Sequence, residues 1–267
     1  MKHSCSSQAL AAAGATDFRR MIDAAAVCGF DGVDLEFAPG SIVSPAEFSF
    51  RETGALVQYA LAKRVEVQCI GGGAFRSPRM ADEWEGIARL ISVAHALACP
   101  LVRVVMPPLG DEARFDEEYD AALALLREAL DFARELDLCI GIEPAAGSYA
   151  ATIDEALAVI EDANRRNLGV VYNPAVEAAG GGGSPDEAVE RARGLLLLVR
   201  LAGGGDASIA RRAFDAALNA ARASGFSEYV SDCSVFEPGL AHQAVKDRLV
   251  ANLRHVRALC TAARPHV

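Results

Sequence analysis

Basic and aromatic residues are both scarce in this chain. Lys and Arg number 26 against 36 Asp and Glu, which gives a formal net charge of −10, and aromatic residues make up 6% of the sequence. Because phosphate backbones attract clustered Lys and Arg, this balance argues against a nucleic-acid partner. There is also no run of about 18 apolar residues, so we expect no membrane-spanning segment and no membrane partner.

The seven cysteines do not form a recognisable framework. Their number is odd, no CxxC occurs, and most lie within apolar segments. We therefore interpret them as reduced, small core residues of a cytoplasmic protein. The N-terminal segment superficially resembles a signal peptide, but its apolar core is too short and weak, and we expect none.

What the chain does contain is a regular alternation of short and long apolar patterns. Short runs typical of strands lie at 2–6, 32–37, 65–70, 101–106, 139–143, 168–173, 195–201 and 228–233. Between them, apolar spacing of i, i+3, i+4 predicts helices at 16–28, 52–63, 79–98, 115–136, 152–163, 185–193, 211–223 and 240–262. Helix signals support this assignment, among them Thr152 with Glu155 three residues later, and glycine in Cys28-Gly29-Phe30.

Eight strands alternating with eight helices predict an α/β protein, a single (β/α)₈ TIM barrel domain over residues 1–267. A doubly wound open sheet is the alternative. It is disfavoured because no GxGxxG or phosphate loop follows an early strand and because the eight units are similar in length.

Strand alternation assigns a set of polar side chains to the barrel interior. In 65–70 we expect Val65, Val67 and Cys69 to face the helices, which leaves Glu66 and Gln68 inside. The other polar residues expected inside are Asp34, Glu36, Arg103, Glu143, Asn173, Arg200 and Asp232. A structural salt bridge would explain any one of these charges, but the whole ring is better explained by a functional site at the carboxyl ends of the strands.

Five segments follow one another in the order of a known family. They read CGFDGVDLEF (28–37), AHALACPLVRVV (94–105), LCIGIEP (138–144), NLGVVYNPA (167–175) and SGFSEYVSDC (224–233). With them the chain resembles the xylose isomerase-like barrels of the sugar phosphate isomerase/epimerase group over nearly its whole length.

The resemblance implies a divalent-metal site of Glu, Asp, His and Glu at the ends of the fifth to eighth strands. The matching positions here hold Glu143, Asn173, Arg200 and Asp232. Asparagine brings no charge, and arginine stays protonated and offers only donors. We therefore predict that no metal cofactor is held, that Arg200 pairs with Glu143 and Asp232 in its place, and that Glu143, Asn173 and Asp232 are vestigial ligand positions. A weakly held Mn, Mg or Zn ion stays open as an alternative.

The resemblance also implies an isomerase or epimerase that acts on a small sugar or sugar phosphate. We expect Glu143 and Asp232 to transfer the proton through an enediolate, since paired carboxylates can act as acid and base. The expected substrate-binding residues are Glu36, Gln68, Arg103, Asn173 and Arg200. A phosphate would rest on the Gly203–Gly205 loop near Arg211 and Arg212.

Two other functions remain as hypotheses. One is a barrel whose catalysis has lapsed and which binds or senses a small molecule. The other, a zinc-dependent endonuclease, is disfavoured because the sequence lacks the histidines and the basic groove that this chemistry needs. Related barrels imply a homo-oligomer.

Overall fold

The computed structural model describes residues 1–267 except 45–47, 73–79, 111–113, 180–182, 203–206 and 262–267. Its strands form a closed barrel in which each strand pairs in parallel with the next, and β1 pairs with β8. The strands are β1 Lys2–Ser6, β2 Gly32–Glu36, β3 Glu66–Gly71, β4 Leu101–Val104, β5 Cys139–Ile142, β6 Leu168–Tyr172, β7 Leu196–Ala202 and β8 Tyr229–Cys233. The predicted (β/α)₈ barrel is confirmed.

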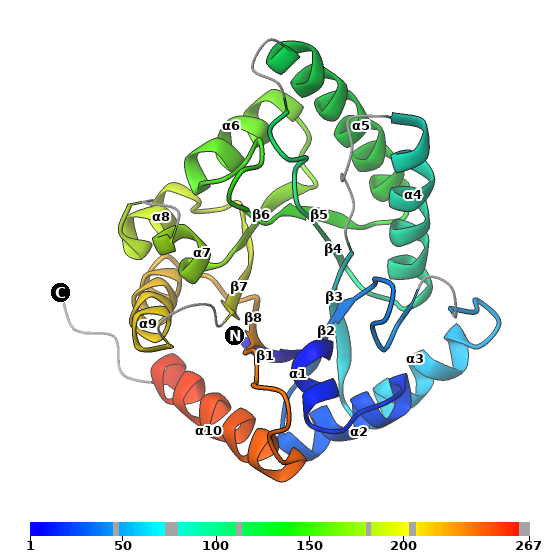
Figure 1. Ribbon diagram of the computed structural model, residues 1–267, viewed down its shortest axis with the longest axis vertical. Helices are drawn as coiled ribbons and strands as arrows, with labels where there is room; N and C mark the ends of the chain where they lie inside the picture. The colour runs from blue at the N-terminus through cyan, green and yellow to red at the C-terminus, as the bar shows by residue number, and fades with distance from the viewer. Residues whose placement is uncertain (45–47, 73–79, 111–113, 180–182, 203–206, 262–267) are drawn as a thin grey trace.

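Helices surround the ring of strands (Figure 1). They are α1 Ser7–Ala12, α2 Phe18–Cys28, α3 Thr53–Ala62, α4 Met80–Ala96, α5 Phe115–Glu135, α6 Ile153–Ala163, α7 Pro174–Ala179, α8 Pro185–Arg191, α9 Ala207–Ala223 and α10 His242–Thr261. The short helices α1 and α7 were not predicted. Each follows a strand directly, and six residues are too few for an apolar period to be recognised.

The helix ends carry the expected local chemistry. Thr152 and Glu155 form a reciprocal capping box at the start of α6. At the end of α2, Gly29 has a φ of 88°, the left-handed conformation that glycine adopts without a steric penalty. Such local signals determine where these helices begin and end before any long-range contact is considered.

Two apolar clusters lie on opposite sides of the sheet. The larger one fills the space between the strands and the helices. The smaller one is made by Cys69, Leu101, Val171 and Leu198, all from strands, and it fills the interior of the barrel. The polar interior residues described below lie nearer the carboxyl ends of the strands.

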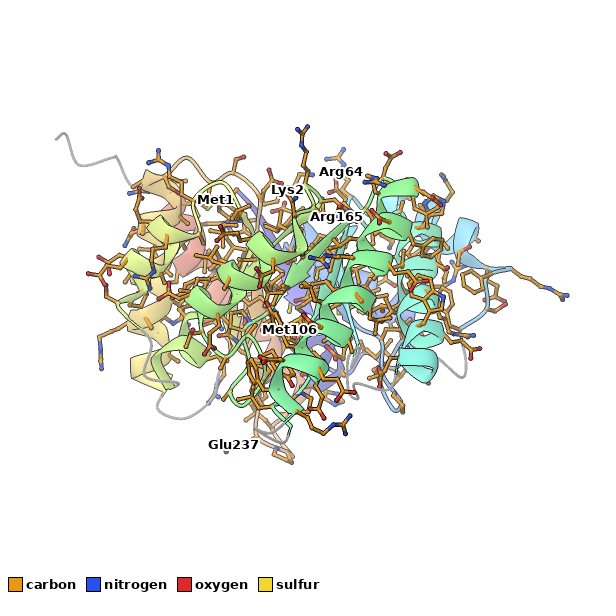
Figure 2. All side chains as sticks on the ribbon, turned by 90° about the horizontal axis from the view of Figure 1, so that it is seen from above. Met1, Lys2, Arg64, Met106, Arg165 and Glu237 are labelled. Atoms are coloured by element: carbon orange, nitrogen blue, oxygen red, sulfur yellow. The ribbon has the colours of Figure 1, made fainter. Side chains whose placement is uncertain are left out.

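The two ends of the barrel are easily told apart in Figure 2. Lys2 at the start of β1, together with Arg64 and Arg165 just before β3 and β6, marks the amino end. Glu237, in the segment after β8, lies at the opposite end, where the strands finish. In the part of the chain that the structure describes, no helix combines the length and apolar character needed to cross a membrane.

Candidate functional site

Glu143 lies between two arginines at the carboxyl end of the barrel. It follows β5 directly, whereas Arg103 is in β4 and Arg200 in β7. Nη1 of Arg200 donates to both carboxylate oxygens, at 2.6 and 2.7 Å, and Nη1 of Arg103 donates to Oε2 at 2.6 Å. All three side chains are buried or nearly so. Two arginines thus bind the Glu143 carboxylate through charge-assisted hydrogen bonds.

Each arginine also holds a carboxylate from β2. Nη2 of Arg103 donates to Glu36 at 2.6 Å, and Nε of Arg200 donates to Asp34 at 3.1 Å. Asp34 is 1% exposed, whereas Glu36 keeps 25% of its side chain in contact with solvent. The arginines therefore link three carboxylates from two sides of the barrel into one network, which we call the arginine–carboxylate cluster (Asp34, Glu36, Arg103, Glu143 and Arg200).

The end of β8 completes the surroundings of Asp34. Ser231 Oγ donates to Oδ2 of Asp34 at 3.2 Å, and the Cys233 thiol reaches the same oxygen at 3.5 Å. Burial raises the pKa of Cys233 to about 12, so the thiol stays protonated and can donate. Nε of Arg200 also lies 3.2 Å from Cys233 Sγ.

The charges in the cluster decide the protonation of Glu143. Burial alone would raise the pKa of this carboxyl, but the positive charges of Arg103 and Arg200 outweigh it and lower the pKa to about 2. With three carboxylates and two guanidiniums, the cluster carries a formal charge of −1. Removing one partner from a buried pair of this kind typically costs about 3–5 kcal/mol, because the other charge is left unpaired.

Asn173 turns its amide nitrogen toward Glu143. Its Oδ1 accepts the backbone N–H of Ala175 at 3.3 Å, at the start of α7, and this fixes the orientation of the amide. Nδ2 then lies 3.4 Å from Glu143 Oε1, a long hydrogen bond. The side-chain oxygen of Asn173 is thus already the acceptor for a backbone N–H at the start of α7.

The chain matches the family model described as xylose isomerase-like TIM barrel over residues 22–259. It belongs to this family. No curated protein matches the chain in sequence.

Solved structures of similar shape include several sugar epimerases. An L-ribulose 3-epimerase superposes with a TM-score of 0.78 at 16% identity, over 100% of this chain and 99% of the other. A D-allulose 3-epimerase from Methylomonas sp., in complex with D-allulose, gives a TM-score of 0.73 at 17% identity, over 96% of each chain. The IOLI protein with a zinc atom gives 0.79 at 16% identity, over 98% of this chain and 100% of the other. At such identities these likenesses show the fold.

Around Glu143, the side chains present N–H donors rather than lone pairs at the position where a divalent metal would bind. Nη1 of Arg200 occupies the position between the two Glu143 oxygens, and Asn173 presents its amide nitrogen there. A cation at this position would meet two guanidiniums, which repel it and offer no lone pair. Among the described residues, no three His, Cys, Asp or Glu side chains are arranged to hold a metal ion.

The expected position of Asp232 is wrong. Its oxygens accept the backbone N–H of Ser234 at 3.0 Å and Nδ2 of Asn252, on α10, at 2.9 Å. Ser231 and Cys233 take the inward positions, so alternation along β8 turns Asp232 toward the helices. The second carboxylate partner of Arg200 is Asp34, not Asp232. The polar side chain of Asp232 was expected to point into the barrel, whereas Asn252 on α10 donates to it on the outer side of the barrel.

In the segment 65–70 the expected orientation is confirmed for Val65 and Val67, which pack in the larger cluster, and it is wrong for Cys69. Cys69 lies in the inner cluster, not against the helices. The pairing of β2 with β3 shifts by one residue, because Val33 pairs with Val67 and Asp34 with Cys69. This β-bulge at Gln68 interrupts the alternation from which the prediction was made.

Two predicted substrate-binding elements are not joined to the cluster by a hydrogen bond among the described residues, or lie outside those residues. Gln68 is buried at the bulge, and among the described residues its Nε2 has no hydrogen-bond partner. The predicted phosphate loop, Gly203–Gly205, lies outside the described residues. Arg211 donates from Nη2 to Oδ1 of Asn252 on α10.

Ser231 and Cys233 of β8 were not among the predicted site residues, and Asp34 was predicted to lie inside the barrel without a role of its own. The inward assignment of Asp34 was available from alternation along β2, but no family ligand position matched it. Ser231 and Cys233 could have been found by continuing the alternation from the apolar Val230, which packs against the helices.

Proposed function

We propose that this chain is a sugar or sugar-phosphate isomerase or epimerase that works without a divalent cation. The observation that carries the proposal is the position of Arg200 Nη1, within 2.7 Å of both Glu143 oxygens. Arg103 and Arg200 bring two positive charges to the ring of carboxylates, as a divalent ion would. Such fixed cations can stabilise the oxygen of an enediolate.

Proton transfer is assigned to carboxylates of the arginine–carboxylate cluster. A carboxylate removes the proton from the carbon beside the sugar carbonyl, an enediolate forms, and the proton returns to the other face or to the neighbouring carbon. Glu143 keeps this role in the proposal. Because Asp232 faces α10, we assign the second role to Glu36, which shares Arg103 with Glu143 and is partly exposed at the mouth.

The second candidate function is a small-molecule binding or regulatory barrel without turnover. It is favoured by the low pKa of Glu143, about 2, which makes this carboxylate a weak proton acceptor while it is held by both arginines. Catalysis requires the substrate to displace one guanidinium from Glu143; binding alone does not.

Solvent deuterium exchange separates the two functions. The protein is treated with a chelator and incubated in D₂O with a panel of ketoses, aldoses and their phosphates, and deuterium at the carbon beside the carbonyl is measured. Exchange that survives chelation and is lost in Glu143→Gln supports the metal-free enzyme. Thermal stabilisation by a sugar without exchange supports the binding barrel, and the absence of both overturns a carbohydrate function.

Control variants remove a charge far from the cluster. Arg193→Met breaks an exposed pair with Glu190 and should leave exchange unchanged. The remaining sequence-based expectations, a single domain, a cytoplasmic location, a homo-oligomer and no nucleic-acid or membrane partner, stay predictions.

A further inference from the structure

Three residues of neighbouring strands form one row beneath the mouth of the barrel. Glu36 of β2 pairs in register with Gly71 of β3, and Gly71 pairs with Arg103 of β4. Arg103 nevertheless binds Glu36, which lies two strands away. Since neighbouring strands lie about 4.8 Å apart, the guanidinium has to cross β3 directly over Gly71.

The crossing leaves no room for a side chain on β3. A Cβ placed on Gly71 would overlap Nη2 and Cζ of Arg103 and would lie 2.7 Å from its Nε, closer than the 3.0 Å that real Cβ atoms keep. The three nearest atoms all belong to the far end of a flexible side chain. An added methyl group can therefore displace the guanidinium without moving the strands.

The neighbouring glycine differs in this respect. A Cβ on Gly72 would overlap the backbone carbonyl oxygen of Phe37, so a substitution there would disturb the backbone that follows β2. Gly71 has no positive φ that would require glycine on backbone grounds. The three atoms nearest to a Cβ at Gly71 all belong to Arg103, so it is first of all Arg103 that requires the absence of a side chain there.

We propose that Gly71 is a positioning residue that acts through Arg103, holding its guanidinium across β3 so that one arginine binds Glu36 and Glu143 together. The functional consequence rests on the proposed function, because the bridge places one of the two positive charges and links the two carboxylates assigned to proton transfer. The structural consequence does not depend on any substrate.

The first test is a double-mutant cycle on the ligand-free protein. Gly71→Ala, Arg103→Met and the double variant are compared by thermal unfolding, with Gly54→Ala in α3 as a control, because a Cβ at Gly54 would meet no described atom within 4 Å beyond its chain neighbours and its own helix backbone. Gly71→Ala is expected to lower the Tm by several degrees, on the order of 3–10 °C. In the Arg103→Met background the same change should cost about 1 °C or less, because the displaced group is gone.

The double-mutant cycle also gives a decisive result if one of the variants does not fold. If Gly71→Ala fails to fold while the double variant folds, Gly71 acts through Arg103. The proposal would be overturned by equal losses in both backgrounds. It would also be overturned if both chains that carry Gly71→Ala fail to fold while Arg103→Met alone folds. A purely structural role of glycine in β3 produces either of those outcomes.

The second test is rescue by a conservative variant. In Arg103→Lys the ammonium group can still reach Glu143, which follows the neighbouring strand β5. The lysine side chain is shorter than that of arginine, so it need not cross β3. Arg103→Lys alone should weaken binding of a sugar identified in the exchange panel, whereas Arg103→Lys in the Gly71→Ala background should bind about tenfold tighter than Gly71→Ala alone. Weaker binding in the double variant contradicts the proposal. If no sugar binds at all, the proposed function fails, while the unfolding cycle still decides the role of Gly71.

Discussion

Glu143 is the residue on which the other charges of the site depend. Its carboxylate is buried, and two guanidiniums satisfy it through hydrogen bonds of 2.6–2.7 Å. Buried ion pairs are weak contributors to stability as a whole, but the loss of one member is costly because its partner stays behind as an unpaired charge. Substitutions in the cluster should therefore have much larger effects than substitutions of surface pairs.

Arg200→Met tests this asymmetry. The change keeps a long, flexible side chain but removes the charge that Glu143 and Asp34 share, and we expect the free energy of unfolding to fall by about 3–5 kcal/mol. Urea denaturation measures the change. The matched control Arg193→Met removes one exposed partner of Glu190, and it should cost less than about 1 kcal/mol. Similar losses of unfolding free energy in both variants would show that the buried pairs of the cluster contribute no more than an exposed pair.

The pH dependence of stability tests the protonation state of Glu143. The pKa of this carboxyl falls from an ordinary value of 4.5 to about 2 in the folded protein. Its contribution is therefore fully present above pH 4.5 and is lost as the pH falls toward 2, and it amounts to about 3 kcal/mol. Urea unfolding between pH 6 and pH 3 should show this decline, and Glu143→Gln should have a shallower acid limb. An unchanged slope in that variant would contradict the ion-pair assignment.

At the scale of single elements, local signals predicted the helix ends but could not predict the strand irregularities. The capping box of α6 and the glycine end of α2 depend on neighbours within four residues, so the sequence contains them. The bulge at Gln68 depends on how β3 pairs with β2, and the outward turn of Asp232 depends on Asn252 of α10, twenty residues later. The bulge reverses the direction that alternation assigns to Cys69. Alternation along β8 is kept, and the inward prediction for Asp232 was wrong because the alternation was not started from the apolar Val230.

Two helix starts provide a matched comparison of capping. Thr152 accepts a hydrogen bond from the Glu155 N–H at the start of α6, whereas Ser184 makes no side-chain cap hydrogen bond at the start of α8. Thr152→Ala should lower the free energy of unfolding by about 1 kcal/mol, and Ser184→Ala by clearly less. Chemical denaturation of both variants checks the difference. Equal losses would mean that the capping box adds nothing beyond the residue preference at that position.

At the scale of the whole molecule, the barrel was predictable and the chemistry of its mouth was predictable only in part. Eight apolar runs of strand length, each followed by a longer helical period, leave few architectures, and the observed strands match those runs closely. The inward positions of Arg103, Glu143 and Arg200 also followed from alternation. The predicted pairing of Arg200 with Glu143 is confirmed. The partners Glu36 of Arg103 and Asp34 of Arg200 could not be predicted, because side chains from β2, β4 and β7 meet only across the closed barrel.

The same geometry predicts how a metal site could be rebuilt. Adding Mn, Mg or Zn to the unmodified protein should not raise its Tm, because the Arg200 guanidinium lies between the Glu143 oxygens.

The double change Asn173→Asp and Arg200→His removes the guanidinium and supplies a carboxylate and an imidazole beside Glu143, a donor set that suits Zn or Mn. A ligand at a hundred times its Kd stabilises the folded state by about 2.7 kcal/mol, so the Tm of this variant should rise on titration with metal and return with chelator. Each single change should respond less, since Asn173→Asp leaves the arginine in place and Arg200→His leaves an uncharged amide at Asn173 beside Glu143. A metal-dependent rise in the Tm of the unmodified protein, equal to that of the double variant, would contradict this prediction. It would show that a cation displaces the Arg200 guanidinium and that the site still binds metal.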